Sequence, residues 1–471
     1  MLWTIKLEFT PDGGEPQVRQ IGTISRSMID LRPEEAGLTL QEGRELLRGI
    51  ECQIIANQVH FYTLCFGSCP DCGQRRQFND VRTKCVQTVF GAYRFRGRGI
   101  RTCACEVEQG HPASFFPLGV LIPRRTTPEV RFLFAGLGAR MPYREASRML
   151  EVCGFGRMRA SRTTIWRHTV ALGKAIEEDQ LDASRTSTSS SIVAPRTVSV
   201  GIDDTDIRHC QRDASRQIQV TGGRTERNGK LAERFAFVAA APGWSRDQFA
   251  GILHQLGIGG CKSVRVVSDG DDGLRNFVQA SLGKQVQSQL DWFHIGMRLE
   301  RLRKAVRLPM TYAEFLRNPE QLKPLERRDS GIRDVLWRGR PWRALLQLAR
   351  LRRDIERWAA KHPGVGADSL ARVTRAIDEL QGYVGGNRRS VPSFAKARAA
   401  GRRISTAHVE SVMNRLINHR MSKKQQMRWS PAGAHYLLQV RVELLNDTLL
   451  DPFRVWHERF RTGSRYTPCL A

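Results

Sequence analysis

Apolar and polar positions follow a strand-like pattern over residues 197–294. Val198, Val200 and Ile202 alternate with polar or small residues that include Asp203, so apolar side chains point to one face of a strand and Asp203 to the other. A second β-branched run ends at Asp269 in the same way. Together with glycine-containing turns, the pattern predicts strands near 197–208, 214–222, 231–241, 262–268 and 287–294, and helices near 245–256 and 270–282.

The order of these elements predicts a ribonuclease-H-like mixed sheet. Three strands that can form a meander are followed by alternating helices and strands, and in that order the first and fourth strands are neighbours. This order places Asp203 near Asp269. Further along, a helical segment that starts at Thr406 carries Glu410 beside an apolar stripe that includes Val409. Glu410 falls in the first turn, where the helix dipole favours an ionised carboxylate.

Two strand-end aspartates and a helix-borne glutamate form a candidate site for hard divalent cations, which prefer oxygen ligands. We therefore expect Asp203, Asp269 and Glu410 to be both the catalytic residues and the ligands of Mg²⁺ (or Mn²⁺). Any one of these acids alone would more often be an ordinary surface residue. The hypothesis depends on all three occurring in this order along the chain.

Four cysteines predict a structural zinc site in an N-terminal zinc ribbon, residues 61–120. A Cys-x-x-Cys turn is followed by a strand-like run at 87–96 and then a second cysteine pair, a spacing that lets four thiolates converge on one Zn²⁺. The alternative is a set of ordinary reduced cysteines, and the nearby Cys65 and Cys85 are spare thiols or alternative ligands. The expected ligands are Cys69, Cys72, Cys103 and Cys105. Residues 1–60, with strand-like runs at 3–9 and 53–59 and a helical segment at 39–49, receive no role.

A helix-turn-helix is expected at 125–181. Thr127-Pro128 resembles a helix start, a second helix ends near Gly154, and a third begins near Ser161. An ordinary three-helix bundle is the alternative. Polar and basic residues at the start of the third helix would meet DNA phosphates or base edges; they are Arg162, Thr163, Thr164 and Arg167. A Ser/Thr-rich stretch at 182–196 is the expected linker.

The remainder completes a multidomain α/β chain. We expect the first part of the catalytic core at 197–295, an all-helical insertion at 296–405, and the C-terminal core helices that carry Glu410 at 406–462. Polar residues near the three acids are further candidates for DNA contact; they are His294, Asn414, Arg415, Arg420, Lys423 and Lys424.

Charge indicates a polyanionic partner. The 471 residues include 75 Lys and Arg against 47 Asp and Glu, a formal net charge of +28. An excess this large favours nucleic acid, and DNA in particular given the candidate motifs. The sequence has neither an apolar run long enough to cross a bilayer nor the pattern of a signal peptide, so we expect a cytoplasmic protein that does not bind membranes. Its 11 cysteines are unevenly spaced, which disfavours a disulfide framework.

Several longer motifs resemble one known family. Gly-Ile-Asp-Asp at 201–204, Val-Val-Ser-Asp-Gly-Asp-Asp-Gly-Leu-Arg at 266–275, Leu-Asp-Trp-Phe-His-Ile-Gly-Met-Arg-Leu at 290–299 and the block at 409–441 resemble the ISKra group of bacterial insertion-sequence transposases. These are DDE-type enzymes. The resemblance implies that Asp203, Asp269 and Glu410 are the catalytic triad. It also implies that the protein binds the terminal inverted repeats of an insertion sequence and target DNA, as a homodimer or larger assembly on DNA.

Two other functions share parts of this pattern. A domesticated, catalytically idle transposase would bind DNA without needing the three acids. A ribonuclease-H-like nuclease would need the acids but not the strand-joining step or the upstream DNA-binding modules. Cutting and joining of a labelled DNA end in the presence of Mg²⁺ distinguishes the three possibilities.

Overall fold

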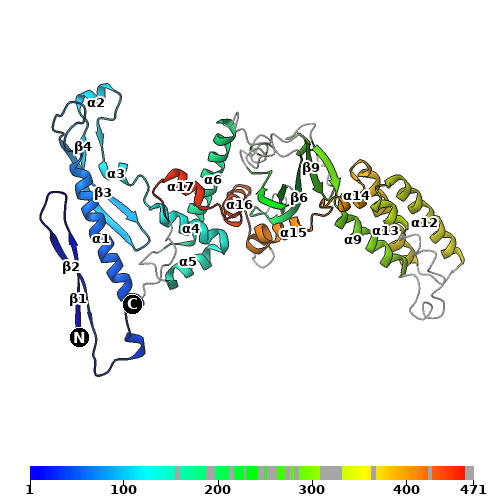
Figure 1. Cartoon of the computed structure of the whole chain (residues 1–471), viewed down its shortest axis with the longest axis horizontal. Coiled ribbons are helices and arrows are strands. Elements are labelled where there is room, and N and C mark those ends of the chain that lie inside the picture. The colour runs from blue at the N-terminus through cyan, green and yellow to red at the C-terminus, as the bar shows by residue number, and fades with distance from the viewer. Residues whose placement is uncertain are drawn as a thin grey trace. The chain divides into compact units, whose positions relative to one another are not determined.

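The computed structural model shows a mixed α/β chain that divides into two compact units, 1–172 with 448–471 and 173–447 (Figure 1). The residues that the structure describes, apart from isolated positions between 249 and 280, are 1–153, 160–186, 197–211, 217–227, 230–241, 263–270, 286–307, 331–361, 367–422 and 427–461. The expected helices at 245–256 and 270–282 fall mostly outside them.

The first unit begins with an antiparallel hairpin, β1 (Leu2–Phe9) and β2 (Gln17–Ser25), followed by the long helix α1 (Leu40–Leu64). Thr39 and Glu42 form a capping box that starts α1. The strand expected at 53–59 is wrong, because these residues continue α1. Their β propensity is outweighed by a helix that is already nucleated and packs against β2 and β4.

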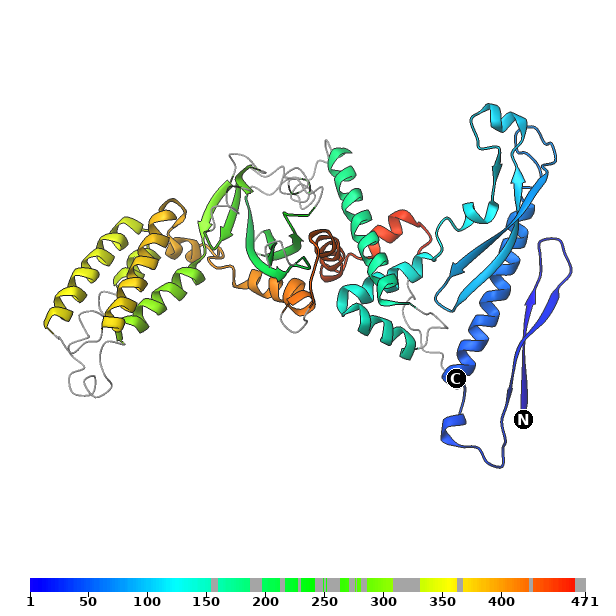
Figure 2. The ribbon, with the colours of Figure 1, turned by 180° about the vertical axis from the view of Figure 1, so that it is seen from behind.

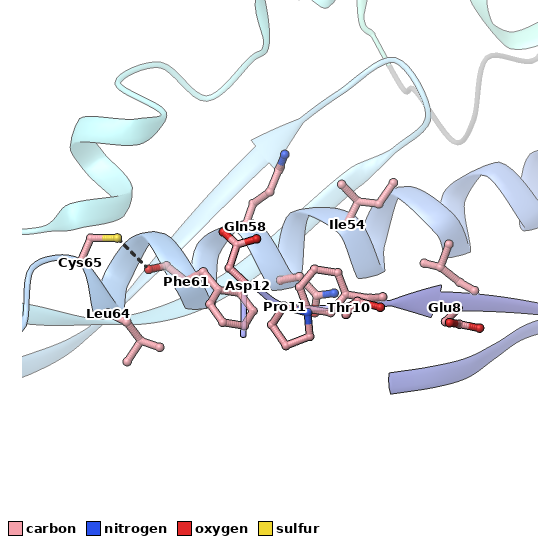
Figure 3. A pocket seen from close by; sticks show the side chains of 12 residues that line it. Glu8, Thr10, Pro11, Asp12, Ile54, Gln58, Phe61, Leu64 and Cys65 are labelled. Carbon is pink, nitrogen blue, oxygen red and sulfur yellow. Dashed lines mark hydrogen bonds between the residues drawn. The ribbon is translucent and has the colours of Figure 1, made fainter. Parts of the chain in front are cut away.

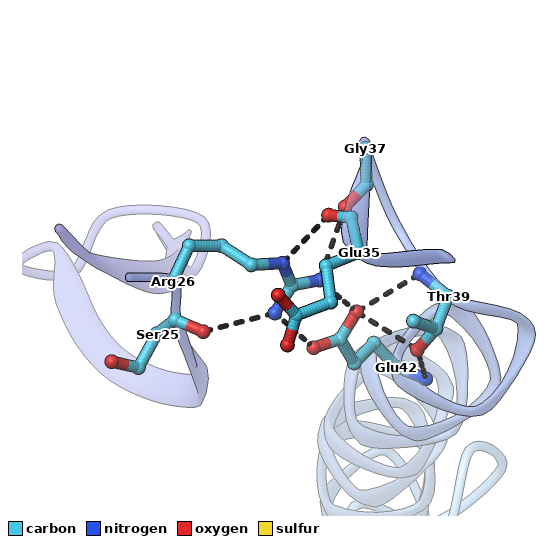
Figure 4. A network of polar contacts seen from close by, with 6 residues as sticks. All are labelled: Ser25, Arg26, Glu35, Gly37, Thr39 and Glu42. Carbon is cyan, nitrogen blue, oxygen red and sulfur yellow. Dashed lines mark hydrogen bonds and ion pairs between the residues drawn. The ribbon is translucent and has the colours of Figure 1, made fainter. Parts of the chain in front are cut away.

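Arg26 ties the end of the hairpin to the start of α1 (Figure 4). Its guanidinium donates to both carboxylate oxygens of Glu42, at 2.7 and 2.5 Å. It also donates to the backbone carbonyl oxygens of Ser25, Glu35 and Gly37. A planar five-donor group held in this way fixes the angle at which the chain enters the helix.

A groove of about 740 Å³ lies between β1 and α1 (Figure 3). Its lining is mainly apolar and includes Leu7, Ile54 and Phe61. The Phe61 ring lies 5.6 Å from that of Phe9, between ring centroids. The hairpin therefore contacts α1 through a few large side chains rather than through a continuous core.

A second sheet in the same unit carries the cysteine region. It consists of β3 (Phe78–Gln87), β4 (Ala92–Arg101) and β5 (Ser114–Phe115), with α2 (Ala104–Glu108) and α3 (Pro117–Leu121) beside it. The run at 87–96, expected to be one strand, contains the turn between β3 and β4. The Thr88 hydroxyl accepts the N–H groups of Phe90 and Gly91 and so closes that turn.

Three helices follow much as the sequence predicts: α4 (Pro128–Arg140), α5 (Tyr143–Cys153) and α6 (Arg162–Thr186). Gly138 lets α4 and α6 approach closely, since an added Cβ there would lie 2.4 Å from the Thr169 hydroxyl. The α6 helix continues to Thr186, into the stretch expected to be linker, and residues 187–196 lie outside the described set. The short helix α17 (Leu450–Trp456) completes this unit.

The second unit is built on a five-stranded sheet with the order β10-β9-β6-β7-β8. β6 pairs antiparallel with β7 and parallel with β9, which confirms that the first and fourth strands are neighbours. Val198, Val200 and Ile202 point into an apolar core on one face. The strands are β6 (Thr197–Arg208), β7 (Gln217–Arg227), β8 (Lys230–Phe237), β9 (Ser263–Ser268) and β10 (Val286–Leu290).

Helices cover this sheet from two directions. α15 (Ala407–Met413) contacts β6 and β7, and α16 (Pro431–Leu445) contacts β8 (Figure 1). His435 of α16 is 1% exposed, accepts the Val238 N–H at Nδ1 and places Nε2 2.7 Å from a carboxylate oxygen of Glu177 on α6. Because Nδ1 accepts a hydrogen bond, Nε2 carries the ring hydrogen and donates it to Glu177.

The described part of the insertion between β10 and α15 is helical, as expected, and its helices pack around an apolar core that also includes Leu290 of β10. Figure 2 shows its two longest helices running beside each other, in yellow and gold. The expected strand at 287–294 is too long, because β10 ends at Leu290 and a helix starts at Trp292. The insertion helices are α9 (Trp292–Arg307), one at 331–337, α12 (Pro341–Lys361), α13 (Ala367–Gly386) and α14 (Phe394–Ala399), with a 3-10 turn η4 (Arg388–Ser390).

Candidate active site and metal centres

Strand register brings Asp203 and Asp269 level with each other. The last parallel pair between β6 and β9 joins Gly201 to Val267. Asp203 lies two residues after Gly201, and Asp269 lies two residues after Val267. Both therefore lie just beyond the carboxyl end of the β6–β9 pairing. Both side chains therefore project from the same face of the sheet at neighbouring strand positions. This register agrees with the expectation that the two acids lie near each other.

A third acid, Asp291, extends the row to β10. Leu290 pairs with Ser268, so Asp291 stands beside Asp269. The Asp291 N–H donates to the Ser268 carbonyl oxygen at 2.9 Å and continues the ladder. Asp203, Asp269 and Asp291 thus occupy equivalent positions on three adjacent parallel strands, where ligands commonly bind in open α/β sheets.

Helix α15 lies against the face from which Asp203 projects. An added Cβ at Gly201 would be 2.5 Å from Val409 Cγ2, and one at Gly222 would be 2.6 Å from Met413 Sδ. Gly222 is the β7 residue opposite Asp203. Glu410 lies between these two contacts in sequence, on the exposed side of the helix. The absence of side chains at the two glycines is what lets the helix that carries Glu410 approach the strands.

Burial and neighbouring charges act on Asp203. Burial raises the pKa of its carboxyl group above the ordinary value, and the negative charges of Asp269 and Asp291 raise it further. The Asp204 N–H, 3.0 Å from Asp203 Oδ1, and the nearby His294 act in the opposite direction. Asp203 therefore lies where negative charge accumulates, which is the environment that favours a bound cation.

Asp204 has different partners. Its carboxylate accepts the Thr221 hydroxyl at 2.5 Å and the Gln219 side-chain amide at 3.2 Å, both on β7. Strand alternation puts Asp204 on the opposite face from Asp203. This separation favours Asp203 over its neighbour as the acid of the candidate site.

Four cysteines form the clearest metal-binding geometry in the described part of the chain. The sulfur atoms of Cys69, Cys72, Cys103 and Cys105 all lie within 4.8 Å of one another, and no second group of three or more convergent ligands occurs among the described residues. The ligand atoms of the three predicted acids therefore do not converge within such a distance of one another in this structure. Asp203, Asp269 and Glu410 remain a prediction that rests on register and helix placement.

The cysteine site fits zinc. Gly73, with a φ of +71°, closes the turn after Cys72, and Cys103 is the N-cap of α2, so the pair with a single intervening residue converges across a helix start. Backbone N–H groups from Cys72 and Asp71 help to lower the pKa of the Cys69 thiol to about 7. Four sulfur donors fill the four positions of a tetrahedral ion, which matches a structural Zn²⁺ site. Cys65 and Cys85 are exposed and lie outside the group.

The DNA candidates on α6 lie at the surface. Arg162, Thr163 and Arg167 are exposed, and Thr164 is half-buried. The Ser161 hydroxyl accepts the Thr164 N–H at 3.2 Å and so caps the helix. These residues are accessible to a partner, and their contact with DNA stays a prediction.

Among the DNA candidates that follow Glu410, the prediction that Arg420 contacts DNA is wrong. Its side chain is 1% exposed and stacks against Trp429, with the guanidinium carbon 5.4 Å from the ring centroid. Arg415 is exposed and Asn414 is half-buried, accepting the Asn418 amide at 2.8 Å. Lys423 and Lys424 lie outside the described residues.

His294 lies on the first turn of α9 rather than on a strand. Its Nε2 is 3.8 Å from the carboxylate of Asp291. His294 lowers the pKa of Asp203, and its side chain is 23% exposed. The sequence reasoning identified His294 but did not identify Asp291, Thr406 or Tyr383, which contact the same region.

Comparison with known proteins gives one distant structural similarity. No family model matches the sequence. No curated protein matches it either. Among solved structures, the chain is similar to one in the Drosophila P element transposase strand transfer complex, with a TM-score of 0.32 and 13% identity over 73% of this chain and 95% of that one. Similarity at this level identifies neither fold nor function. Among the described residues, no helix is long and apolar enough to cross a membrane.

Proposed function

We propose that the chain is a DDE-type DNA transposase that cuts the ends of an insertion sequence and joins the freed 3′-hydroxyl groups to target DNA. The observation that carries this proposal is the register of β6 and β9, which sets Asp203 and Asp269 level with each other, while the helix that carries Glu410 packs against β6 and β7. The strand order, with β6 between an antiparallel meander and two parallel strands, supports a ribonuclease-H-like core. The all-helical insertion then separates the second acid from the third.

The proposed cofactor is a pair of Mg²⁺ (or Mn²⁺) ions. Asp203, Asp269 and Glu410 would hold these ions. When bound, such ions polarise the scissile phosphate and stabilise charge on the leaving oxygen. The donor set fits, because carboxylates suit Mg²⁺ and because Asp203 is partly desolvated beside two further acids whose repulsion a cation would offset.

The other residues bind and position DNA. Glu410 and Arg415 are exposed on adjoining turns, so a DNA strand can approach the acids from that side. We infer that α6 and the zinc-bearing module recognise the element ends, and that Lys423, Lys424 and Asn414 contact phosphates. The net charge of +28 supplies a sequence-independent attraction to DNA. Pairing of two ends implies at least a dimer on DNA.

The test is a cutting and joining assay with the DNA that flanks this reading frame. Labelled end fragments are incubated with Mg²⁺ and a supercoiled target plasmid. We expect strand cleavage followed by joined products with the wild-type protein. Asp269→Asn and Glu410→Gln should each abolish both steps while leaving the affinity for the end fragment within about twofold.

Each outcome identifies one function. Cutting without joining indicates a ribonuclease-H-like nuclease. Tight binding of the end fragment with neither step indicates a catalytically idle DNA-binding protein. Full activity in Asp269→Asn or in Glu410→Gln contradicts the assignment of the three acids. Glu45→Gln, which changes an exposed glutamate of α1, is the matched control for loss of one carboxylate.

A further inference from the structure

Asp291 is a fully buried carboxylate that lies outside the proposed triad, with an exposed fraction of 0%. A buried carboxylate is strongly destabilising unless hydrogen bonds satisfy its oxygen atoms. Asp291 has such partners on both oxygens. Oδ1 accepts the Phe293 N–H at 2.8 Å, which caps helix α9, and Oδ2 accepts the hydroxyl group of Thr406. Both oxygens therefore act as acceptors.

Thr406 is the residue that starts the helix carrying Glu410. It is 4% exposed and is the N-cap of α15. Its carbonyl oxygen accepts the Glu410 N–H at 3.0 Å and the Val409 N–H at 2.6 Å. The hydroxyl of Thr406 does not cap its own helix and is directed to Asp291 instead. The start of α15 is thereby fixed to the end of β10.

A continuous chain of hydrogen bonds links the second acid to the third. The Ser268 carbonyl, immediately before Asp269, accepts the Asp291 N–H. The Asp291 carboxylate accepts the Thr406 hydroxyl, and the Thr406 carbonyl accepts the Glu410 N–H. Two further bonds hold the segment before Thr406 along β10 and α9: the Trp292 N–H to the Ile404 carbonyl at 3.0 Å, and the Gln289 amide to the Arg403 carbonyl at 3.3 Å.

We propose that Asp291 and Thr406 are positioning residues whose hydrogen bond sets the separation between Asp269 and Glu410. This inference rests on the proposed function, since it assigns a purpose to the bond only if those acids hold the catalytic cations. Asp291 does not itself face DNA, because it has no exposed surface and its oxygens are already occupied by Phe293 and Thr406. A displacement of about 1 Å at a catalytic group can lower a rate by about 100-fold, so a buried bond at this point has a large effect.

Isosteric substitutions at Thr406 give the sharpest test. Thr406→Val keeps the shape of the side chain and removes the hydroxyl, whereas Thr406→Ser keeps the hydroxyl. Thr374→Val is the matched control, because it removes a threonine hydroxyl on α13 that bonds only within its own helix, to the Leu370 carbonyl. Cleavage of the end fragment is measured in single turnovers over a range of Mg²⁺ concentrations. Mn²⁺ affinity is measured separately by electron paramagnetic resonance, with no DNA present.

We expect Thr406→Val to cleave at least 10-fold more slowly, to need several-fold more Mg²⁺ for its half-maximal rate and to bind Mn²⁺ correspondingly more weakly. For Thr406→Ser, the cleavage rate, the Mg²⁺ requirement and the Mn²⁺ affinity should each lie within about threefold of the wild-type value. Thr374→Val should match the wild type. A purely structural role would lower the melting temperature without shifting the Mg²⁺ dependence of the folded protein.

The outcomes separate this inference from the proposed function. If Thr406→Val cleaves and binds Mn²⁺ like the wild type while Glu410→Gln is inactive, the positioning role is wrong and the transposase assignment stands. If the wild-type protein binds Mn²⁺ but does not cut, the transposase assignment is wrong and the Mn²⁺ affinities of the Thr406 variants still decide the positioning role. If the wild type neither cuts nor binds Mn²⁺, both are overturned.

Discussion

The hydroxyl group of Tyr383 donates a hydrogen bond of 2.6 Å to the backbone carbonyl oxygen of Asp269. Tyr383 lies on α13, so the helical insertion directly contacts the loop that follows β9. The Arg298 guanidinium carbon lies 3.6 Å from the centroid of the Tyr383 ring and holds it from the other side. Burial raises the pKa of Tyr383 well above its ordinary value, so the phenol stays protonated and remains a donor.

Tyr383→Phe should slow DNA cleavage about fivefold, because a neutral hydrogen bond of roughly 1 kcal/mol is lost while the ring keeps its place under Arg298. The ratio of wild-type to variant rates should be constant from pH 6 to pH 9, since the Tyr383 hydroxyl does not ionise in that range. Single-turnover rates measured across this range check both statements. A ratio that falls toward one at high pH would show that the phenol titrates normally.

Gly201→Ala should destabilise the second unit by about 1–3 kcal/mol, because the new methyl group would overlap Val409 and displace α15 from the strands. The free energy of unfolding in urea measures this loss. Adding Val409→Ala to the same chain should recover part of it. Gly382→Ala is the control: its Cβ enters open space on α13, and we expect a gain of about 0.5–1 kcal/mol.

The cysteine site should hold one zinc ion per chain. Four sulfur atoms within 4.8 Å of one another satisfy a tetrahedral ion, whose binding free energy stabilises the local fold. Metal analysis of the purified protein measures the stoichiometry, and calorimetry with and without a chelator measures the stabilisation. Cys72→Ser should lose the zinc and melt at lower temperature, whereas Cys85→Ser should keep it. Retention of zinc by Cys72→Ser would contradict the ligand set.

The Arg26–Glu42 contact should make the stability of the first unit depend on acidity. Hydrogen bonds from Arg26 and then Thr39 lower the pKa of Glu42 from 4.5 to about 2. A lowered pKa contributes stability that is fully present above about pH 4.5 and is lost as the pH falls through about 2. Melting temperatures of the wild type and Glu42→Gln should therefore converge as the pH is lowered through this window. Glu45→Gln should run parallel to the wild type throughout.

Arg162→Ala and Arg167→Ala should each weaken DNA binding and reduce its salt dependence by about one counterion. Both side chains are exposed at the start of α6. Binding isotherms at several salt concentrations give the slope of the affinity against salt. Arg148→Ala, on α5 and paired with Glu145 at 3.0 Å, is the matched control and should leave the slope unchanged. Equal slopes for all three variants would remove α6 from the interface.

The neighbouring positions of Asp203 and Asp269 could be predicted because strand alternation and element order are local signals that together imply one pairing. The start of the helix that carries Glu410 could also be predicted, from the apolar stripe on that helix. The bond between Asp291 and Thr406 was not, since the two residues are 115 positions apart and neither belongs to a periodic pattern. A pairing of that kind is visible only after the insertion has folded.

Arg420 was misjudged for a different reason. Its place a few residues after Glu410 predicts DNA contact, but residues 414–422 form a π-helix, which has more residues per turn. The wider turn rotates later side chains relative to a 3.6-residue period, and Arg420 points inward to Trp429. The strand expected at 53–59 failed because β-branched residues also occur in helices that are held by a strong cap and by packing.

The tether between Asp291 and Thr406 has a consequence for synthesis of the chain. When a ribosome has synthesised residues 1–405, Asp203 and Asp269 are present. Glu410 and Thr406, which anchors the helix of Glu410, are not yet part of the chain. Under the proposed function, a nascent polypeptide, or one that ends before Glu410, therefore cannot cut DNA. Cutting then also requires that the helices between Asp269 and Glu410 have folded.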